Sequence, residues 1–148
     1  MRVSVSVPRA AAYIVLAVSV FAGSETVFKD RNGDAIRGYG AVAYFTEHRP
    51  VKGADQFTYS WMDAKWKFAS AANRDKFVSD PAHYAPQYGG YCSYGLSRGH
   101  KSSIDPEAWR IIDGKLYLNY SKDVKAEWEK DSPGNIRKAN VNWKSLGK

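Results

Sequence analysis

Cysteine is nearly absent from this sequence: Cys92 is the only one among 148 residues. A single cysteine cannot form a disulfide within its own chain, so Cys92 must be free, bonded to another chain, or a ligand. Most free cysteines are small buried hydrophobic residues, and this structural interpretation stays open for Cys92. The length allows one domain with a real core, and 44% hydrophobic and 14% aromatic residues are consistent with that.

Blocks of like charge are also missing. The formal net charge is +7, but the basic residues are scattered and no run of five or six occurs. No nucleic-acid-binding motif accompanies them, so we expect a solvated basic surface and no nucleic-acid partner. The sequence also lacks a phosphate-binding loop, a dinucleotide fingerprint and a Gly-x-Ser-x-Gly elbow. These absences favour a binding domain over an enzyme.

The N-terminus has the features of a targeting segment. Basic residues precede an apolar run from Ala10 to Phe21, which ends beside small side chains. This pattern predicts a signal peptide over residues 1–22, with cleavage after Ala22 or Ser24. The run is too short to span a bilayer comfortably, although an uncleaved membrane anchor stays open as the alternative. We therefore expect a periplasmic or secreted protein with no membrane association after cleavage.

After a polar linker and arm at residues 23–35, the pattern predicts one domain over residues 36–146. Apolar and polar side chains alternate over residues 57–61 and again over residues 65–69, which predicts two strands joined by a turn. A second pair of alternating runs flanks Asp113-Gly114. That dipeptide is a strong signal for a two-residue hairpin.

Capping residues predict short helices between and after these hairpins. Ser70 is expected to cap a helix over residues 71–78, and Asp80-Pro81 to begin the next one. A further short helix is expected over residues 93–99, closed by its final glycine, and Ser121 is expected to cap another. The predicted class is therefore α+β: a small single domain in which short β-hairpins pack against several short helices.

Candidate site residues are most concentrated between Tyr84 and Tyr94. This stretch contains four tyrosines, the pair Gly89-Gly90 and Cys92. Glycine lets the backbone turn sharply or approach another group closely. Tyrosine has an apolar body and a polar tip, which suits the wall of a half-wet pocket. Aromatic residues elsewhere would either line the same pocket or form the core, and both interpretations stay open. The candidates for a small-ligand or cofactor site are Tyr84, Tyr91, Trp66 and Trp109, with Tyr59 and Trp61 as further members.

Cys92 and His83 are the candidate metal ligands. They lie nine residues apart, so a fold-back at Gly89-Gly90 would bring a thiolate and an imidazole together. These donors suit copper or zinc. Two protein ligands are too few for a tight site, so we expect an open and exchangeable one. The alternatives are a thiol-based redox protein and a cysteine nucleophile with His83 as its base, for which no hydrolase signature is present.

Five stretches carry a family resemblance: Gly38 to Phe45, Trp66 to Arg74, Pro81 to Cys92, Asp105 to Trp109 and Gly114 to Ser121. In these stretches the chain resembles the secreted, single-domain branch of the YHS-domain proteins. The resemblance implies a small α+β domain and a link to transition-metal handling. We therefore expect a secreted or periplasmic binding domain. Metal-ion binding or trafficking is its most concrete form, and a small-molecule-binding module with an aromatic pocket is the alternative.

Overall fold

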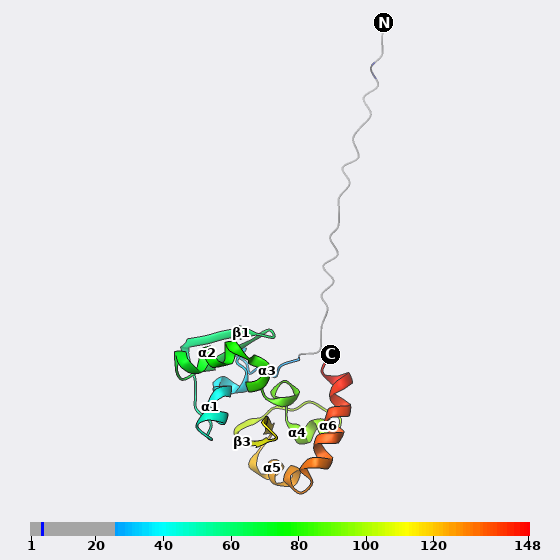
Figure 1. Ribbon diagram of the computed structural model, residues 1–148. Coiled ribbons are helices and arrows are strands. Elements are labelled where there is room, and N and C mark those ends of the chain that lie inside the picture. Colours follow the sequence, from blue (N-terminus) through cyan, green and yellow to red (C-terminus); the bar gives the residue numbers. More distant parts are fainter. Residues whose placement is uncertain (1–3, 5–25) are drawn as a thin grey trace.

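Two antiparallel β-hairpins carry the strands of the protein, and helices pack around them (Figure 1). The computed structural model describes residue 4 and residues 26–148. The predicted signal peptide and its cleavage sites lie outside these residues, apart from Ser4. The predicted α+β class is confirmed, with short hairpins and short helices in one domain.

The first hairpin pairs β1 (Ala54–Trp61) with β2 (Ala64–Phe68). Its two-residue turn consists of Met62 and Asp63, whose φ angles are 52° and 57°. Both values are in the left-handed region, as a type I′ turn requires, although neither residue is glycine. The predicted strand pair is confirmed. Ala64, which the sequence placed in the turn, is the first residue of β2.

The second hairpin pairs β3 (Asp105–Ile112) with β4 (Lys115–Asn119) around Asp113 and Gly114. The φ angles of these turn residues are 51° and 72°, so the predicted tight hairpin is confirmed. The register shifts between Asp105 and Trp109, which lets Pro106 lie in the strand at an irregular position.

Short helices connect and cover the hairpins, and their predicted caps are largely confirmed. Ser70 Oγ accepts a hydrogen bond from Asn73 N at 3.1 Å, and Ser121 Oγ accepts one from Val124 N at 3.1 Å. Each cap satisfies a backbone N–H that has no partner within the helix. The helices are α1 (Ala41–Thr46), α2 (Ala71–Ser79), α3 (Pro81–Tyr84), α4 (Ser93–Ser97), α5 (Lys122–Glu129) and α6 (Ser132–Leu146), with the 3₁₀ turns η1 (Ile36–Gly38) and η2 (Gln87–Gly90).

The core forms two clusters of buried side chains. The first extends from the β1–β2 hairpin and α2, with Trp66, Phe68 and Phe77, to α1 and β4, with Tyr44 and Leu118. The second lies among β4, α4, α5 and α6 and includes Leu96 and Trp128. Figure 1 shows β1, α1 and α2 on one side of the molecule and α4, α5 and α6 on the other. The segment from α3 to α4 connects the two sides, so the residues of the central tyrosine-rich stretch reach both clusters.

Residues 26–35, predicted as part of a linker and arm, pack as part of the domain. Val27 and Ala35 are buried in the core. Phe28 N donates a hydrogen bond to Gly89 O at 2.9 Å, and Asp34 forms a bridge with Lys65 of β2. The polar composition of this stretch concealed its few buried apolar residues. Its backbone is held to both the first hairpin and η2.

No helix in residues 26–148 is both long enough and apolar enough to cross a membrane.

Candidate functional site

Cys92 is buried at the start of α4, where its sulfur takes part in three hydrogen bonds. Its Sγ accepts from Gly95 N at 3.4 Å and from Tyr120 N at 3.2 Å. The thiol donates to Asn119 Oδ1 at 3.6 Å. The same oxygen accepts from Tyr94 N at 3.1 Å, which fixes the orientation of the Asn119 amide.

These bonds give Cys92 a structural role. The sulfur caps α4 and also satisfies a backbone N–H at the end of β4, so it ties two elements together. The interpretation of Cys92 as a buried structural residue therefore has direct support. Asn119 is fully buried, and its Nδ2 has no hydrogen-bond partner among the described residues.

His83 lies away from this arrangement. It is exposed on α3, and its ring packs against Phe45 and Tyr84, with centroid separations of 5.2 Å and 4.7 Å. The chain then passes through left-handed residues at 88–90, and the Cys92 sulfur accepts a hydrogen bond from Tyr120 N, directly after β4. His83 is not among the residues that line the cavity at Cys92, so the predicted pairing of these two side chains is not observed.

His100, and not His83, is the histidine that lines the cavity at Cys92. Gly99 closes α4 with a φ of 89°, and His100 N donates to Gly95 O at 3.1 Å. A side chain at Gly95 would come within 2.6 Å of Ser102 Oγ, so the segment after Gly99 packs directly against α4. The predicted helix closure at Gly99 was the signal that could have identified His100. Because α4 is only five residues long, a chain that reverses at Gly99 brings His100 back beside the first turn of the helix, close to Cys92 in the same cavity wall.

We call the cavity at Cys92 the thiol pocket. Its volume is about 370 Å³, and its walls come from α4, the segment after it, the end of β4 and α5. It is lined by Cys92, Tyr94, Gly95, Arg98, His100, Ser102, Tyr120 and Val124.

A metal site has little geometric support in the described part of the chain. No group of three or more His, Cys, Asp or Glu side chains among residues 26–148 is placed to hold a metal ion. Copper or zinc binding at Cys92 stays a prediction.

The four aromatic residues predicted to form one pocket lie in different contacts. Trp109 packs edge-on against Tyr44 at 5.3 Å, and Tyr84 packs edge-on against Phe45 at 5.5 Å. Tyr91 is buried against Phe28, Trp143 and the Lys101 ammonium group. Among these four predicted residues, only Trp66 lines a second, apolar cavity.

We call this second cavity the tryptophan pocket. Its volume is about 240 Å³, and Trp61 and Trp66 of the first hairpin face it together with Tyr88 of η2 and Trp143 of α6. Trp61 was a predicted further candidate, whereas Trp143, which lies 77 positions after Trp66, was not predicted to line a pocket. The other lining residues are Thr26, Val27, Met62, Ala82, Ala85, Pro86, Gln87 and Gly89.

The aromatic walls of the tryptophan pocket are fixed by hydrogen bonds and stacking. Trp66 Nε1 donates to Trp61 O at 2.9 Å, and the Trp66 ring stacks on Phe77 at 4.9 Å. Tyr88 OH donates to Asn140 Oδ1 at 2.9 Å. Burial raises the pKa of Tyr88 well above its usual range, so the phenol stays a hydrogen-bond donor even in alkaline solution.

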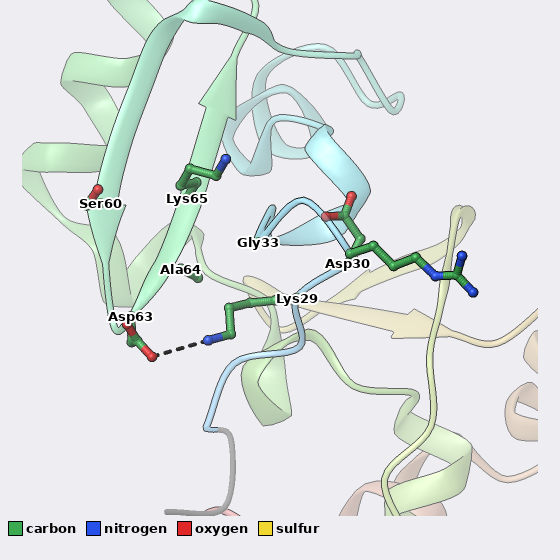
Figure 2. A pocket seen from close by; sticks show the side chains of 8 residues that line it. Lys29, Asp30, Gly33, Ser60, Asp63, Ala64 and Lys65 are labelled. Atoms are coloured by element: carbon green, nitrogen blue, oxygen red, sulfur yellow. Dashed lines mark hydrogen bonds and ion pairs between the residues drawn. The ribbon is translucent and has the colours of Figure 1, made fainter. Parts of the chain in front are cut away.

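A third cavity, of about 390 Å³, lies between the 29–33 loop and the first hairpin (Figure 2). It is polar and open, and Figure 2 shows Lys29 reaching Asp63 at the hairpin tip. Their ion pair measures 3.2 Å. Asp30 Oδ1 accepts hydrogen bonds from Asn32 N and Asp34 N, which shapes the loop. These charged groups are used to hold the loop to the hairpin, so we assign the cavity a structural role.

No family model matches this chain, and comparisons with curated proteins and with solved structures found no similar protein. The resemblance to YHS-domain proteins therefore stays a prediction.

Proposed function

We propose that this protein is a binding module for a small uncharged molecule with an aromatic or apolar ring, held in the tryptophan pocket. One observation carries the proposal: three of the five tryptophans, together with Tyr88, line a single cavity. Sites for small molecules are typically concave and lined mainly by apolar and aromatic side chains, with few polar groups.

The lining determines the class of ligand. None of the described lining residues carries a charge, so an ion would lose its hydration without a compensating partner. Uncharged polar groups are present in the lining, namely the side chains of Gln87 and Thr26, the Tyr88 hydroxyl and indole N–H groups. The volume of about 240 Å³ is below the range of roughly 300–1,000 Å³ found for drug-sized ligands, which limits the ligand to one or two rings.

Preorganisation supports binding at this pocket. Trp66 is 2% exposed and fixed by its hydrogen bond and its stacking on Phe77. Tyr88 is held by α6 through Asn140. Because these walls are already ordered, a ligand would lose little affinity to the ordering of side chains.

Metal binding and thiol redox chemistry have weaker geometric support. The Cys92 sulfur is already engaged in three hydrogen bonds, and a metal ion would have to displace the thiol proton and its contact with Asn119. Cys92 has no second cysteine in the chain with which to form an internal disulfide. A periplasmic or secreted location remains part of the proposal through the predicted signal peptide, so the ligand would be met outside the cytoplasm.

Indole N–H resonances test the proposal directly, with p-cresol as the probe. Each of the five tryptophans contributes one resonance to a nitrogen-15 correlation spectrum. We expect p-cresol to shift the resonances of Trp61, Trp66 and Trp143 and to leave those of Trp109 and Trp128 in place, because neither lines the pocket.

A matched pair of variants locates the site. Ala82 is an exposed residue that lines the tryptophan pocket, and Ala126 is an exposed helical residue that does not. We expect Ala82→Phe to weaken p-cresol binding by about tenfold or more, equivalent to about 1.4 kcal/mol, and Ala126→Phe to have no effect. Equal affinity in the two variants, or no shift in any of the three indole resonances at millimolar p-cresol, would contradict the proposal.

A further inference from the structure

The thiol pocket differs in chemistry from the tryptophan pocket and shares no lining residue with it. Its described lining contains no tryptophan and no Asp or Glu, but it includes the guanidinium group of Arg98 and the imidazole of His100. A cavity with basic groups and no acidic lining is suited to an anion rather than to a neutral molecule or a cation.

Arg98 is arranged so that its hydrogen-bond donors remain available. The guanidinium carbon lies 5.7 Å from the centroid of the Tyr94 ring. This cation–π contact uses the face of the group, while the N–H donors lie along its edge. No carboxylate pairs with Arg98 within residues 26–148, whereas Arg110 forms an ion pair with Glu129.

The remaining walls are suited to an apolar body. Tyr94, Tyr120 and Val124 line the pocket, and Cys92 lies in the wall with 1% of its surface exposed. Tyr120 is 56% exposed, so its ring offers apolar surface that the protein itself leaves uncovered. The volume of about 370 Å³ lies within the range of roughly 300–1,000 Å³ that is typical of small-molecule sites.

We propose that the thiol pocket binds a small organic carboxylate that carries an apolar ring or chain. The carboxylate would pair with the edge of Arg98, with His100 and Ser102 as further donors, because a guanidinium group matches the geometry of a carboxylate. The apolar body lies against Tyr120 and Val124. This site is separate from the tryptophan pocket and does not depend on the function proposed for it.

Benzoate and its uncharged analogue benzamide distinguish a carboxylate site from a general apolar cavity. These titrations use mature protein that carries Ala82→Phe, which blocks the tryptophan pocket against benzamide. We expect isothermal titration to show that benzoate binds this protein at least about tenfold more tightly than benzamide, because only benzoate can form the ion pair with Arg98. The indole resonances should stay in place during the benzoate titration, since no tryptophan lines the thiol pocket. A result against the thiol-pocket proposal can therefore be told apart from a result against the tryptophan-pocket proposal, because the indole resonances report only on the tryptophan pocket.

Two variants that each remove one positive charge test the role of Arg98. Arg98→Gln removes the guanidinium group at the pocket, and Arg137→Gln removes one from an exposed position of α6 that does not line it. We expect Arg98→Gln to lower the affinity for benzoate to that for benzamide and Arg137→Gln to leave it unchanged. Both residues are exposed, so both variants should fold, and their thermal unfolding would verify it.

A third variant tests the pocket itself. Val124→Phe narrows the cavity while leaving Arg98 in place, and we expect it to weaken benzoate and benzamide alike. The proposal is overturned by equal binding of benzoate and benzamide, by unchanged benzoate affinity in Arg98→Gln, or by the absence of benzoate binding at millimolar concentration.

Discussion

The side chains of Cys92 and Asn119 meet in the interior of the protein, with the thiol sulfur 3.6 Å from Oδ1. Asn119 is the last residue of β4, and Cys92 is the residue that caps α4. Since the two are 27 positions apart, this contact fixes the first turn of a short helix against a strand from a later part of the chain. The lone thiol thus acts as a polar connector inside an apolar core.

Substitution of Cys92 should separate this structural role from simple space filling. Cys92→Ala leaves the N–H groups of Gly95 and Tyr120 without their acceptor. We expect the free energy of unfolding to fall by about 1–3 kcal/mol, measured by urea denaturation. Cys92→Ser should cost less, because a hydroxyl can accept the same bonds. Equal losses in the two variants would show that only the volume of the sulfur matters.

Two glycines with positive φ allow the cost of backbone strain alone to be compared with the cost of strain and steric overlap together. Gly114 has a φ of 72° and open space around it, whereas Gly89 has a φ of 62° and a side chain there would overlap the carbonyl oxygen of Thr26. We expect Gly114→Ala to cost about 1–2 kcal/mol through backbone strain alone. Gly89→Ala should cost clearly more, because it must also displace the segment bonded through Phe28 N. Thermal unfolding of the two variants would measure the difference, and equal costs would contradict the close approach.

Local signals explain the elements that were predicted correctly. Asp113-Gly114 specifies its turn through residues that tolerate positive φ, and Ser70 and Ser121 cap the helices that directly follow them. The turn at Met62 and Asp63 was harder to specify. Neither residue favours the left-handed conformation strongly enough to mark it, and the neighbouring strands impose it.

The candidate sites depend on long-range contacts that no local pattern contains. The aromatic composition was compatible with a core or with a pocket, and the observed structure uses it for both. Trp66 and Trp143 line the same cavity although they are 77 positions apart, and no local pattern links them. His83 was chosen by its spacing from Cys92, but its ring packs against Phe45 and Tyr84, and His100 is the histidine that lines the cavity at Cys92.

The predicted signal peptide can be tested without reference to the fold. We expect the exported protein to begin near Gly23 or Glu25, because small residues follow the apolar run. Intact-mass measurement of protein from the periplasm or the medium would identify the first residue. A mass that retains Met1 would instead favour an uncleaved anchor.

Buried tyrosines should make the protein sensitive to alkaline pH. Burial raises the pKa of Tyr44 far above its usual range, with a smaller contribution from the Glu107 carboxylate. Tyr44 OH also donates to Pro106 O at 2.8 Å, which requires the protonated phenol. In the unfolded chain a tyrosine loses its proton near pH 10. The contribution of Tyr44 to stability is therefore complete below about pH 10 and is lost as the pH rises toward the raised pKa of the folded state.

Two Tyr→Phe variants isolate this effect. Tyr44→Phe should lower the free energy of unfolding at pH 8, because Pro106 O loses its buried donor. It should also flatten the decline in stability that begins at about pH 10, the ordinary tyrosine pKa. Tyr120→Phe, at a ring that is 56% exposed, should leave that decline unchanged. Urea denaturation at several pH values, with tyrosinate absorbance recorded in parallel, would measure both variants. If the two variants lose stability equally steeply, the alkaline transition does not arise from Tyr44, because Tyr44 is buried and Tyr120 is exposed.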